Sequence, residues 1–200
     1  MKGVFAILFI VLLCSFSLAI RDLPENYEDE ITYALSKYPE LEDVNIKFVE
    51  EKIATTMACR PNFNFIYKKK KNREYVITIN NEISESSGFV LSDLSKDAQI
   101  GVIGHELAHI VDYEERNAIQ ILAIGIEHLV KRSQLEKYVD LIAINHGFGK
   151  GIANFTETIV HNKKTPMNYK KNKLNNYYSY SEVRDFSEFI DENGGTSLSK

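Results

Sequence analysis

The sequence contains one long stretch with helical periodicity, SKDAQIGVIGHELAHIVDYEE, at residues 95–115. Its apolar residues recur with the spacing of a helix that packs on a core. They are Ile100, Ile103, Leu107 and Ile110. Ser95 can cap the first turn, where Asp97 also suits the helix dipole. We therefore predict an amphipathic helix that runs from Ser95 to about Glu115.

The chain before this helix alternates between apolar and polar side chains in three short stretches, which predicts strands. The alternating residues are Val44, Ile46 and Phe48, then Phe63, Phe65 and Tyr67, then Tyr75, Ile77 and Ile79. We expect the last two strands to form a hairpin across residues 69–73, with the lysines of 68–71 at its solvated tip. A helix within residues 25–38, closed by Pro39, precedes the strands.

The chain after the long helix favours further helices, at residues 118–130, 133–146, 151–161 and 182–190. Gly147 is well placed to end the second of them. Residues 163–181 are polar and tyrosine-rich and predict no element. The fold class that follows is α+β, a small twisted β-sheet packed on the 95–115 helix with a helical C-terminal half.

Length and composition favour one globular domain. The chain has 200 residues, of which 44% are hydrophobic and 26% charged, with no internal repeat and no low-complexity linker. The net charge of -4 argues against nucleic acid as the main partner, because neutralising phosphates needs a concentrated basic surface. We expect a single domain over residues 20–193, a flexible tail over 194–200, and a monomer.

The first nineteen residues have the pattern of an export signal. Lys2 gives a positive start, residues 4–13 are apolar, and Ala19 offers a small residue for cleavage. The protein is therefore expected to be exported, to a periplasm, a cell surface or the medium, with an uncleaved anchor as the alternative. No later segment predicts a membrane span. Cleavage would remove Cys14 and leave Cys59 as the single cysteine, which we expect to be a buried, inert thiol.

The middle of the long helix carries the motif His105-Glu106-Leu107-Ala108-His109. Its two histidines are four residues apart, so both imidazoles project from one face of the helix and can bind one metal ion. Glu106 lies about 100 degrees round the helix, where its carboxylate can hold a water molecule beside the metal and act as general base. The spacing predicts a metal site rather than two packing histidines.

A catalytic zinc ion takes three protein ligands and one water, so a third ligand must come from elsewhere in the chain. Glu136 and Asp140 are four residues apart on a predicted helix and share one of its faces. One of them can bind the metal while the other orients a ligand histidine through its second ring nitrogen. His128, His146 and His161 are further candidate ligands.

The combination resembles the gluzincin clan, the thermolysin-like zinc peptidases, in which an HExxH helix is completed by a glutamate with an aspartate four residues on. The resemblance implies a zincin-like fold, one Zn²⁺ ion held by His105, His109 and Glu136, and Asp140 as the partner of a ligand histidine. Metzincins would need a glycine and a third histidine where this chain has Asp112 and Glu115, so that class is disfavoured.

The function expected from the resemblance is hydrolysis of peptide bonds in a peptide or protein substrate, by an endopeptidase rather than an exopeptidase. Related enzymes add a Tyr or His that stabilises the oxyanion. We expect that donor at Tyr178 or His161, with Tyr177 and Tyr180 as neighbours that nothing in the sequence excludes. The resemblance also implies that the strand at residues 75–80 could pair with an extended substrate, and a role as an ordinary strand of the sheet is the alternative. A zinc-stabilised binding or scaffold protein without turnover, and a binding module without metal, are the alternatives.

Overall fold

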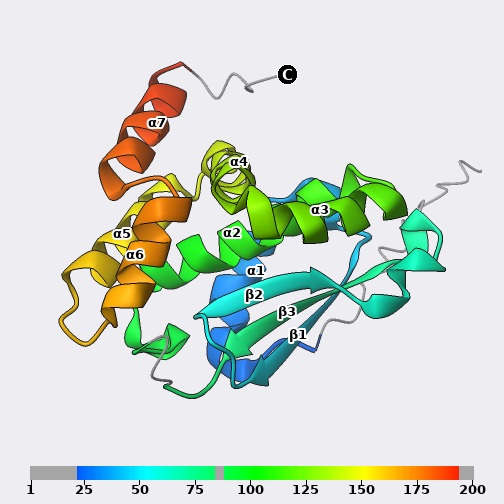
Figure 1. Ribbon diagram of the computed structural model, residues 1–200, viewed down its shortest axis with the longest axis horizontal. Helices are drawn as coiled ribbons and strands as arrows, with labels where there is room; N and C mark the ends of the chain where they lie inside the picture. Colours follow the sequence, from blue (N-terminus) through cyan, green and yellow to red (C-terminus); the bar gives the residue numbers. More distant parts are fainter. Residues whose placement is uncertain (1–21, 84–87, 194–200) are drawn as a thin grey trace, which may run out of the picture.

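The computed structural model describes residues 22–83 and 88–193. The predicted signal peptide, residues 1–19, and the predicted tail, residues 194–200, lie outside these ranges. The described chain is α+β, as predicted, with a three-stranded sheet and seven α-helices (Figure 1). None of the helices in these ranges combines the length and the apolar character needed to cross a membrane.

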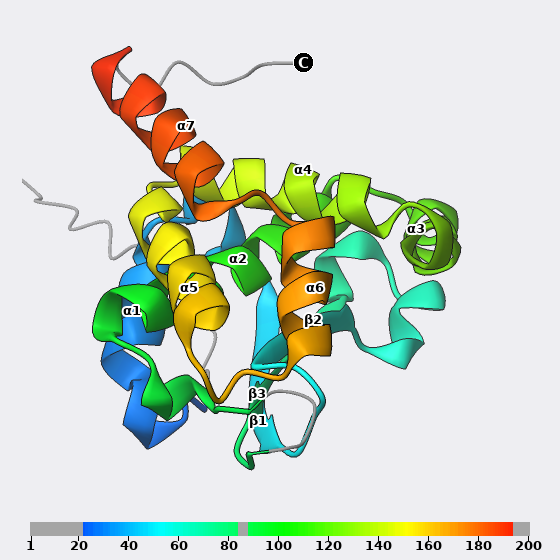
Figure 2. The ribbon, with the colours of Figure 1, turned by 60° about the vertical axis from the view of Figure 1, so that its left-hand side comes forward.

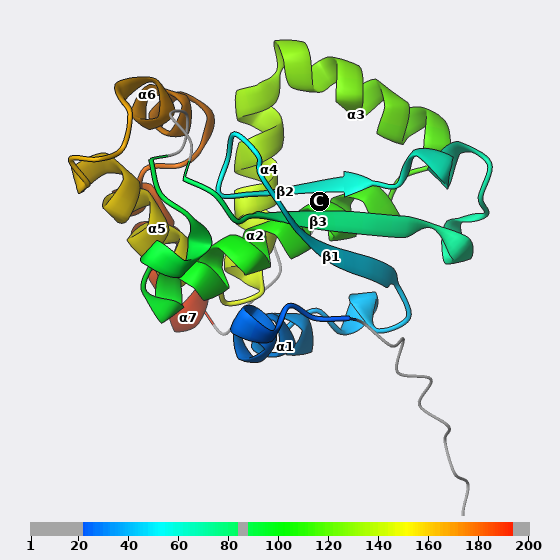
Figure 3. The ribbon, with the colours of Figure 1, turned by 90° about the horizontal axis from the view of Figure 1, so that it is seen from below.

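The sheet has the strand order β1-β3-β2. β1 (Asn45–Glu51) runs parallel to β3 (Glu74–Asn80), and β2 (Met57–Pro61) runs antiparallel to β3. The central strand β3 is buried from Tyr75 to Asn80, and it has a neighbouring strand on each of its two edges. β2 is an edge strand on the side of the sheet that faces α3 (Ala118–Val130), as seen from below in Figure 3.

Two predictions about this sheet are wrong. Residues 63–67 form no strand, because the Asn62 side chain accepts the backbone N–H of Asn64 and starts the 3-10 helix η3 (Phe63–Ile66). Phe63 is 81% exposed and Tyr67 90% exposed, so the apolar alternation there does not mark a buried face. The antiparallel partner of β3 is β2, and the lysines of residues 68–71 lie exposed in the connection between these two strands.

The second wrong prediction concerns substrate pairing. The resemblance implied that the strand at residues 75–80 could pair with a substrate, but the alternative of an ordinary strand is confirmed, because β3 is hydrogen-bonded on one side to β1 and on the other to β2. Its backbone groups are therefore already used. In the described sheet, the edges belong to β1 and β2 instead.

The long predicted helix is confirmed as α2 (Lys96–Glu114), capped by the Ser95 side chain, which accepts the backbone N–H of Ala98. α2 crosses the middle of the molecule between the sheet and the later helices (Figure 1). Ile103, Leu107 and Ile110 are fully buried, as the periodicity predicts. α1 (Glu28–Ser36), β2, α4 (Arg132–Asn145) and α5 (Gly149–His161) all pack against this helix.

Two glycines let α2 and α5 meet backbone to backbone. A Cβ atom on Gly101 would lie 2.2 Å from the carbonyl carbon of Gly151, and one on Gly151 would lie 2.4 Å from the carbonyl oxygen of Asp97. No larger residue fits this approach unless the helices separate. The crossing therefore sets how close α5 lies to the N-terminal half of α2.

The predicted helices of the C-terminal half are confirmed with end shifts of at most two residues. They are α3, α4, α5 and α7 (Tyr180–Glu192). Gly147 has φ 86°, the left-handed conformation that ends α4 before α5 begins. α6 (Met167–Asn176) was not predicted, because of its residues only Lys173 is buried and no apolar stripe marks it. Figure 2 shows α6 beside α5, in contact with it.

Candidate metal centre

α2 places the two motif histidines on one face, one turn apart. Their ring centres are 5.0 Å apart and their planes almost perpendicular, so both Nε2 atoms point toward the same space. The side chains are 10% and 15% exposed. The α-helical geometry alone is enough to produce this pair, because residues four apart lie one above the other.

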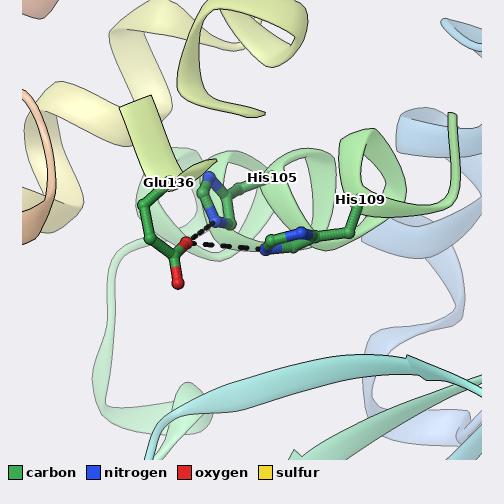
Figure 4. A group of neighbouring side chains, drawn as sticks. All are labelled: His105, His109 and Glu136. Atoms are coloured by element: carbon green, nitrogen blue, oxygen red, sulfur yellow. Dashed lines mark ion pairs between the residues drawn. The ribbon is translucent and has the colours of Figure 1, made fainter. Parts of the chain in front are cut away.

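α4 brings Glu136 to the same space (Figure 4). Its Oε2 atom lies 3.4 Å from His105 Nε2 and 3.6 Å from His109 Nε2. One ligand atom from each of the three side chains lies within 4.8 Å of the others, a grouping that could hold a metal ion. The structure therefore brings together the three residues that the sequence analysis proposed as ligands.

The distances fit a single small ion. Donor atoms held at about 2.0–2.1 Å around a tetrahedral ion are about 3.3–3.4 Å from one another. The two separations measured from Glu136 Oε2 are close to that spacing. Glu136 Oε2 is also buried, and among the described residues it has no hydrogen-bond partner, which is costly for a carboxylate oxygen. A metal ion between the three side chains would satisfy it.

Asp140 lies behind His105. Its Oδ1 atom is 2.9 Å from His105 Nδ1, and its Oδ2 atom accepts the backbone N–H of Tyr178 at 3.2 Å. This aspartate is completely buried. With its proton on Nδ1, the His105 ring would leave Nε2 free to donate a lone pair to a metal, so Asp140 occupies the orienting position that was predicted for it.

The ionisable groups of the cluster shift one another's pKa values. Burial alone would lower the pKa of His105, but Asp140 and Glu136 raise it to about 10. Burial would raise the pKa of Glu136, but the neighbouring imidazoles of His105, His109 and His128 hold it well below its ordinary range. Because a ligand imidazole must be neutral, a metal ion would have to displace a proton from His105.

The second carboxylate oxygen of Glu136 has partners that sequence analysis did not identify. His128 Nε2 lies 3.1 Å from Oε1, and Arg132 Nε lies 3.5 Å from it. His128 comes from the end of α3 and Arg132 from the start of α4, so the two helices hold the carboxylate together. The spacing of four residues between Arg132 and Glu136 was the available signal, since such pairs face each other on a helix.

The other two candidate histidines lie elsewhere. The ring nitrogens of His146 contact the carbonyl oxygen of Ile142 and the carboxylate of Glu40, both at 2.8 Å. His161 is exposed at the end of α5, with its ring centre 6.2 Å from that of Tyr180. Neither belongs to the cluster formed by His105, His109 and Glu136.

A cavity of about 210 Å³ opens beside the cluster. α2 contributes the two histidines and Glu106, and β2, α5 and α6 supply further walls. The Glu106 side chain is buried, and burial raises its pKa, although His109 and His105 lower it in part. Glu106 therefore presents a buried carboxylate with a raised pKa to the same cavity as the two imidazoles.

Tyr177, rather than Tyr178, lines this cavity. Its ring centre is 5.7 Å from that of His105, and burial raises the pKa of its hydroxyl well above the ordinary value, so the group remains a hydrogen-bond donor. Tyr178 packs instead on Phe186, with ring centres 5.0 Å apart, and neither Tyr178 nor His161 is among the residues that line the cavity. The bond from the Tyr178 backbone to Asp140 anchors the chain at this point.

Cys59 of β2 also lines the cavity and is a free thiol. Burial raises its pKa well above the ordinary value, and the nearby carboxylate of Glu106 raises it further. The raised pKa favours the protonated thiol at neutral pH, which fits the predicted inert cysteine, but the side chain is partly buried rather than fully buried as predicted.

The class that this site defines is a protein with a buried two-histidine, one-glutamate cluster able to hold a metal ion, next to a cavity that contains a further glutamate. No family model matches the chain, and neither the curated proteins nor the solved structures include a significant match to it.

Proposed function

We propose that the protein is a zinc-dependent peptidase whose metal is held by His105, His109 and Glu136. The observation that carries the proposal is the position of Glu136 Oε2, buried and 3.4 Å and 3.6 Å from the two Nε2 atoms. Two imidazoles and one carboxylate are the ligand set of known catalytic zinc sites, which keep a fourth position for water. The cavity beside the cluster supplies space for that position and for a substrate.

The protein's own residues have defined tasks in this reaction. When bound, zinc supplies a Lewis acid that polarises the substrate carbonyl and acidifies a water molecule. Glu106 accepts the proton of the attacking water at its carboxylate and passes it to the leaving amine. Tyr177 donates a hydrogen bond from its protonated hydroxyl to the carbonyl oxygen as that oxygen gains charge. Asp140 keeps the His105 ring in the required orientation.

A peptide substrate would lie along β2. Residues 55–59 line the cavity, and β2 is an edge of the sheet, so its outer backbone groups can pair with an extended chain. This position replaces β3, for which the resemblance implied that role. An edge strand above a helix that carries HExxH also supports a zincin-like fold, and the predicted signal supports action outside the cytoplasm.

The proposal is tested by zinc content and peptide cleavage in the same samples. The purified protein, Glu106→Gln and Glu136→Gln are loaded with zinc, dialysed, analysed for metal and incubated with a mixture of peptides whose products are identified by mass spectrometry. Glu157→Gln is the matched control, because Glu157 is exposed on α5 and lies outside the cavity.

We expect one zinc ion per chain and cleavage by the protein and by Glu157→Gln. Glu106→Gln should keep the metal and lose cleavage, whereas Glu136→Gln should lose both. Zinc in the protein without cleavage of any peptide would favour the zinc-stabilised binding protein. Full zinc affinity in Glu136→Gln would remove the third ligand from the proposal.

A further inference from the structure

Lys173 of α6 is a charged side chain inside the cavity without an ionic partner. The residue is 7% exposed, and it lines the same cavity as Glu106 and the two histidines. It forms no ion pair with a carboxylate of residues 22–83 or 88–193; its Nζ atom lies 3.5 Å from the ring centre of Tyr177 and 5.3 Å from that of Phe155.

This arrangement is unusual for a lysine, whose ammonium group is normally kept in water or paired when buried. The two aromatic rings offset only part of the cost of removing the charge from water. Burial lowers the pKa of Lys173, and the opposite effect of Asp140, Glu136 and Glu106 offsets this only in part. An anion bound beside the amine would favour its charged form and supply the ionic partner that the lysine lacks.

The nearby charges are already used. Arg132 is the other cationic residue that lines the cavity, and its Nε atom lies 3.5 Å from Glu136 Oε1. Glu136 and Glu106 belong to the proposed metal site and its base. Lys173 is therefore the cationic side chain of the cavity that can bind a ligand, because Arg132 is already close to Glu136.

The position of Lys173 determines which part of a bound peptide its amine can reach. The Tyr177 ring is near both this amine and the His105 ring, with its centre 3.5 Å from Lys173 Nζ and 5.7 Å from the ring centre of His105. The distance from Lys173 Nζ to the centre of the His105 ring therefore cannot exceed the sum of these two distances. One residue of an extended peptide spans about 3.3–3.6 Å, so the amine is within reach of a substrate atom about one or two residues from the scissile carbonyl.

We propose that Lys173 binds a carboxylate of the substrate, so that the protein prefers peptides with a carboxylate within about two residues of the cleaved bond. This inference rests on the proposed peptidase function. The carboxylate has two possible sources, a free C-terminus or an Asp or Glu side chain, and both offer the same charge and the same two acceptor oxygens.

The test compares matched peptides with the protein and with Lys173→Met. One pair, derived from a peptide that the protein cleaves, has a free or an amidated C-terminus, and a second pair has Asp or Asn next to the scissile bond in an amidated peptide. Lys171→Met is the control variant, because Lys171 is exposed on the same helix and does not line the cavity. Lys173→Arg keeps the charge and serves as the conservative variant. Zinc content and melting temperature are measured for each.

We expect Lys173→Met to lower kcat/KM about tenfold to a hundredfold for the carboxylate member of one pair, mainly through KM, and to leave the amide member and the zinc content unchanged. Lys173→Arg should restore part of the loss, and Lys171→Met should behave as the unmodified protein. The pair that responds identifies the source of the carboxylate.

An equal loss for carboxylate and amide peptides would overturn the proposal, because the lysine would then act on the reacting group itself. A protein that cleaves the carboxylate and amide peptides equally well would overturn it too.

If no peptide is cleaved, calorimetry of the zinc-loaded protein with N-acetylphenylalanine and with its amide separates the two proposals. Binding of the acid alone, lost in Lys173→Met, would support the carboxylate site while the peptidase function fails, and binding of neither would overturn the site as well.

Discussion

Asp140 and His105 form a buried pair in which the carboxylate Oδ1 lies 2.9 Å from the imidazole Nδ1. The aspartate is fixed from the other side by the backbone N–H of Tyr178, at 3.2 Å from Oδ2. The pair ties α2 to α4 and to the start of the segment that carries α7. The orientation of His105, one of the proposed metal ligands, therefore depends on a residue that does not itself reach the cluster.

Asp140→Asn should weaken zinc binding about tenfold to a hundredfold, because the imidazole loses the negative partner that orients it and raises its basicity. The affinity can be measured by competition with a zinc-sensitive chelating dye. Asp185→Asn, at an exposed position of α7, is the control and should bind as the unmodified protein does. Equal affinities in all three would mean that Asp140 has only a packing role.

Removal of the metal should destabilise the folded protein. A ligand that binds only the folded state at a free concentration of about 100 times its Kd stabilises it by about 2.7 kcal/mol. For a chain of this size that corresponds to a decrease in Tm of roughly 5–10 °C when a chelator is added. Scanning calorimetry with and without chelator measures the shift. Glu136→Gln should melt at the same temperature in both conditions, and a similar shift in that variant would place the zinc elsewhere.

Gly101→Ala should destabilise the protein by about 1–3 kcal/mol or more, because the new methyl group would meet the backbone of Gly151 at 2.2 Å. Gly125→Ala is the opposite case. Gly125 is exposed in the middle of α3, and no heavy atom lies within 4 Å of the added Cβ. It should be neutral or stabilise by up to about 1 kcal/mol through helix propensity. Urea unfolding at equal zinc concentration gives both values, and a harmless Gly101→Ala would contradict the close contact of α2 and α5.

Cys59 should react slowly with iodoacetamide at pH 8. Burial and Glu106 raise the pKa of its thiol, so the reactive thiolate is scarce until the pH rises far above the range in which an ordinary cysteine ionises. Mass spectrometry of the protein carrying Cys14→Ser follows the single remaining thiol. The rate should rise by at least about tenfold when the chain is unfolded in denaturant, whereas a native rate equal to that of a free cysteine would contradict the assigned environment.

The parts of the site that could be predicted are those that depend on neighbours along the chain. The two histidines of α2 face the same way because four residues make about one turn of a helix, and the Ser95 cap and the stripe of Ile103, Leu107 and Ile110 identify that helix from its letters. Glu136 and Asp140 were selected for the same reason, with the ligand role of Glu136 coming from the gluzincin resemblance.

Two errors in the predicted elements have separate physical reasons. Phe63 and Tyr67 alternate with polar residues as a half-buried strand does, but Asn62 starts a 3-10 helix that leaves both side chains in solvent. α6 could not be predicted, because the residue that it buries is Lys173, which sequence reasoning assigns to the surface.

Local periodicity in the chain was therefore enough to define the α2 helix, its pair of imidazoles and the carboxylate of Glu106. Only the packing of α4 against α2, and of α6 against α4 and α5, decided that Glu136 Oε2 reaches both imidazoles, that Tyr177 and not Tyr178 lines the cavity, and that Lys173 is enclosed there. These contacts join residues distant in sequence, and their distances depend on how whole helices cross, which no pattern of neighbouring residues encodes.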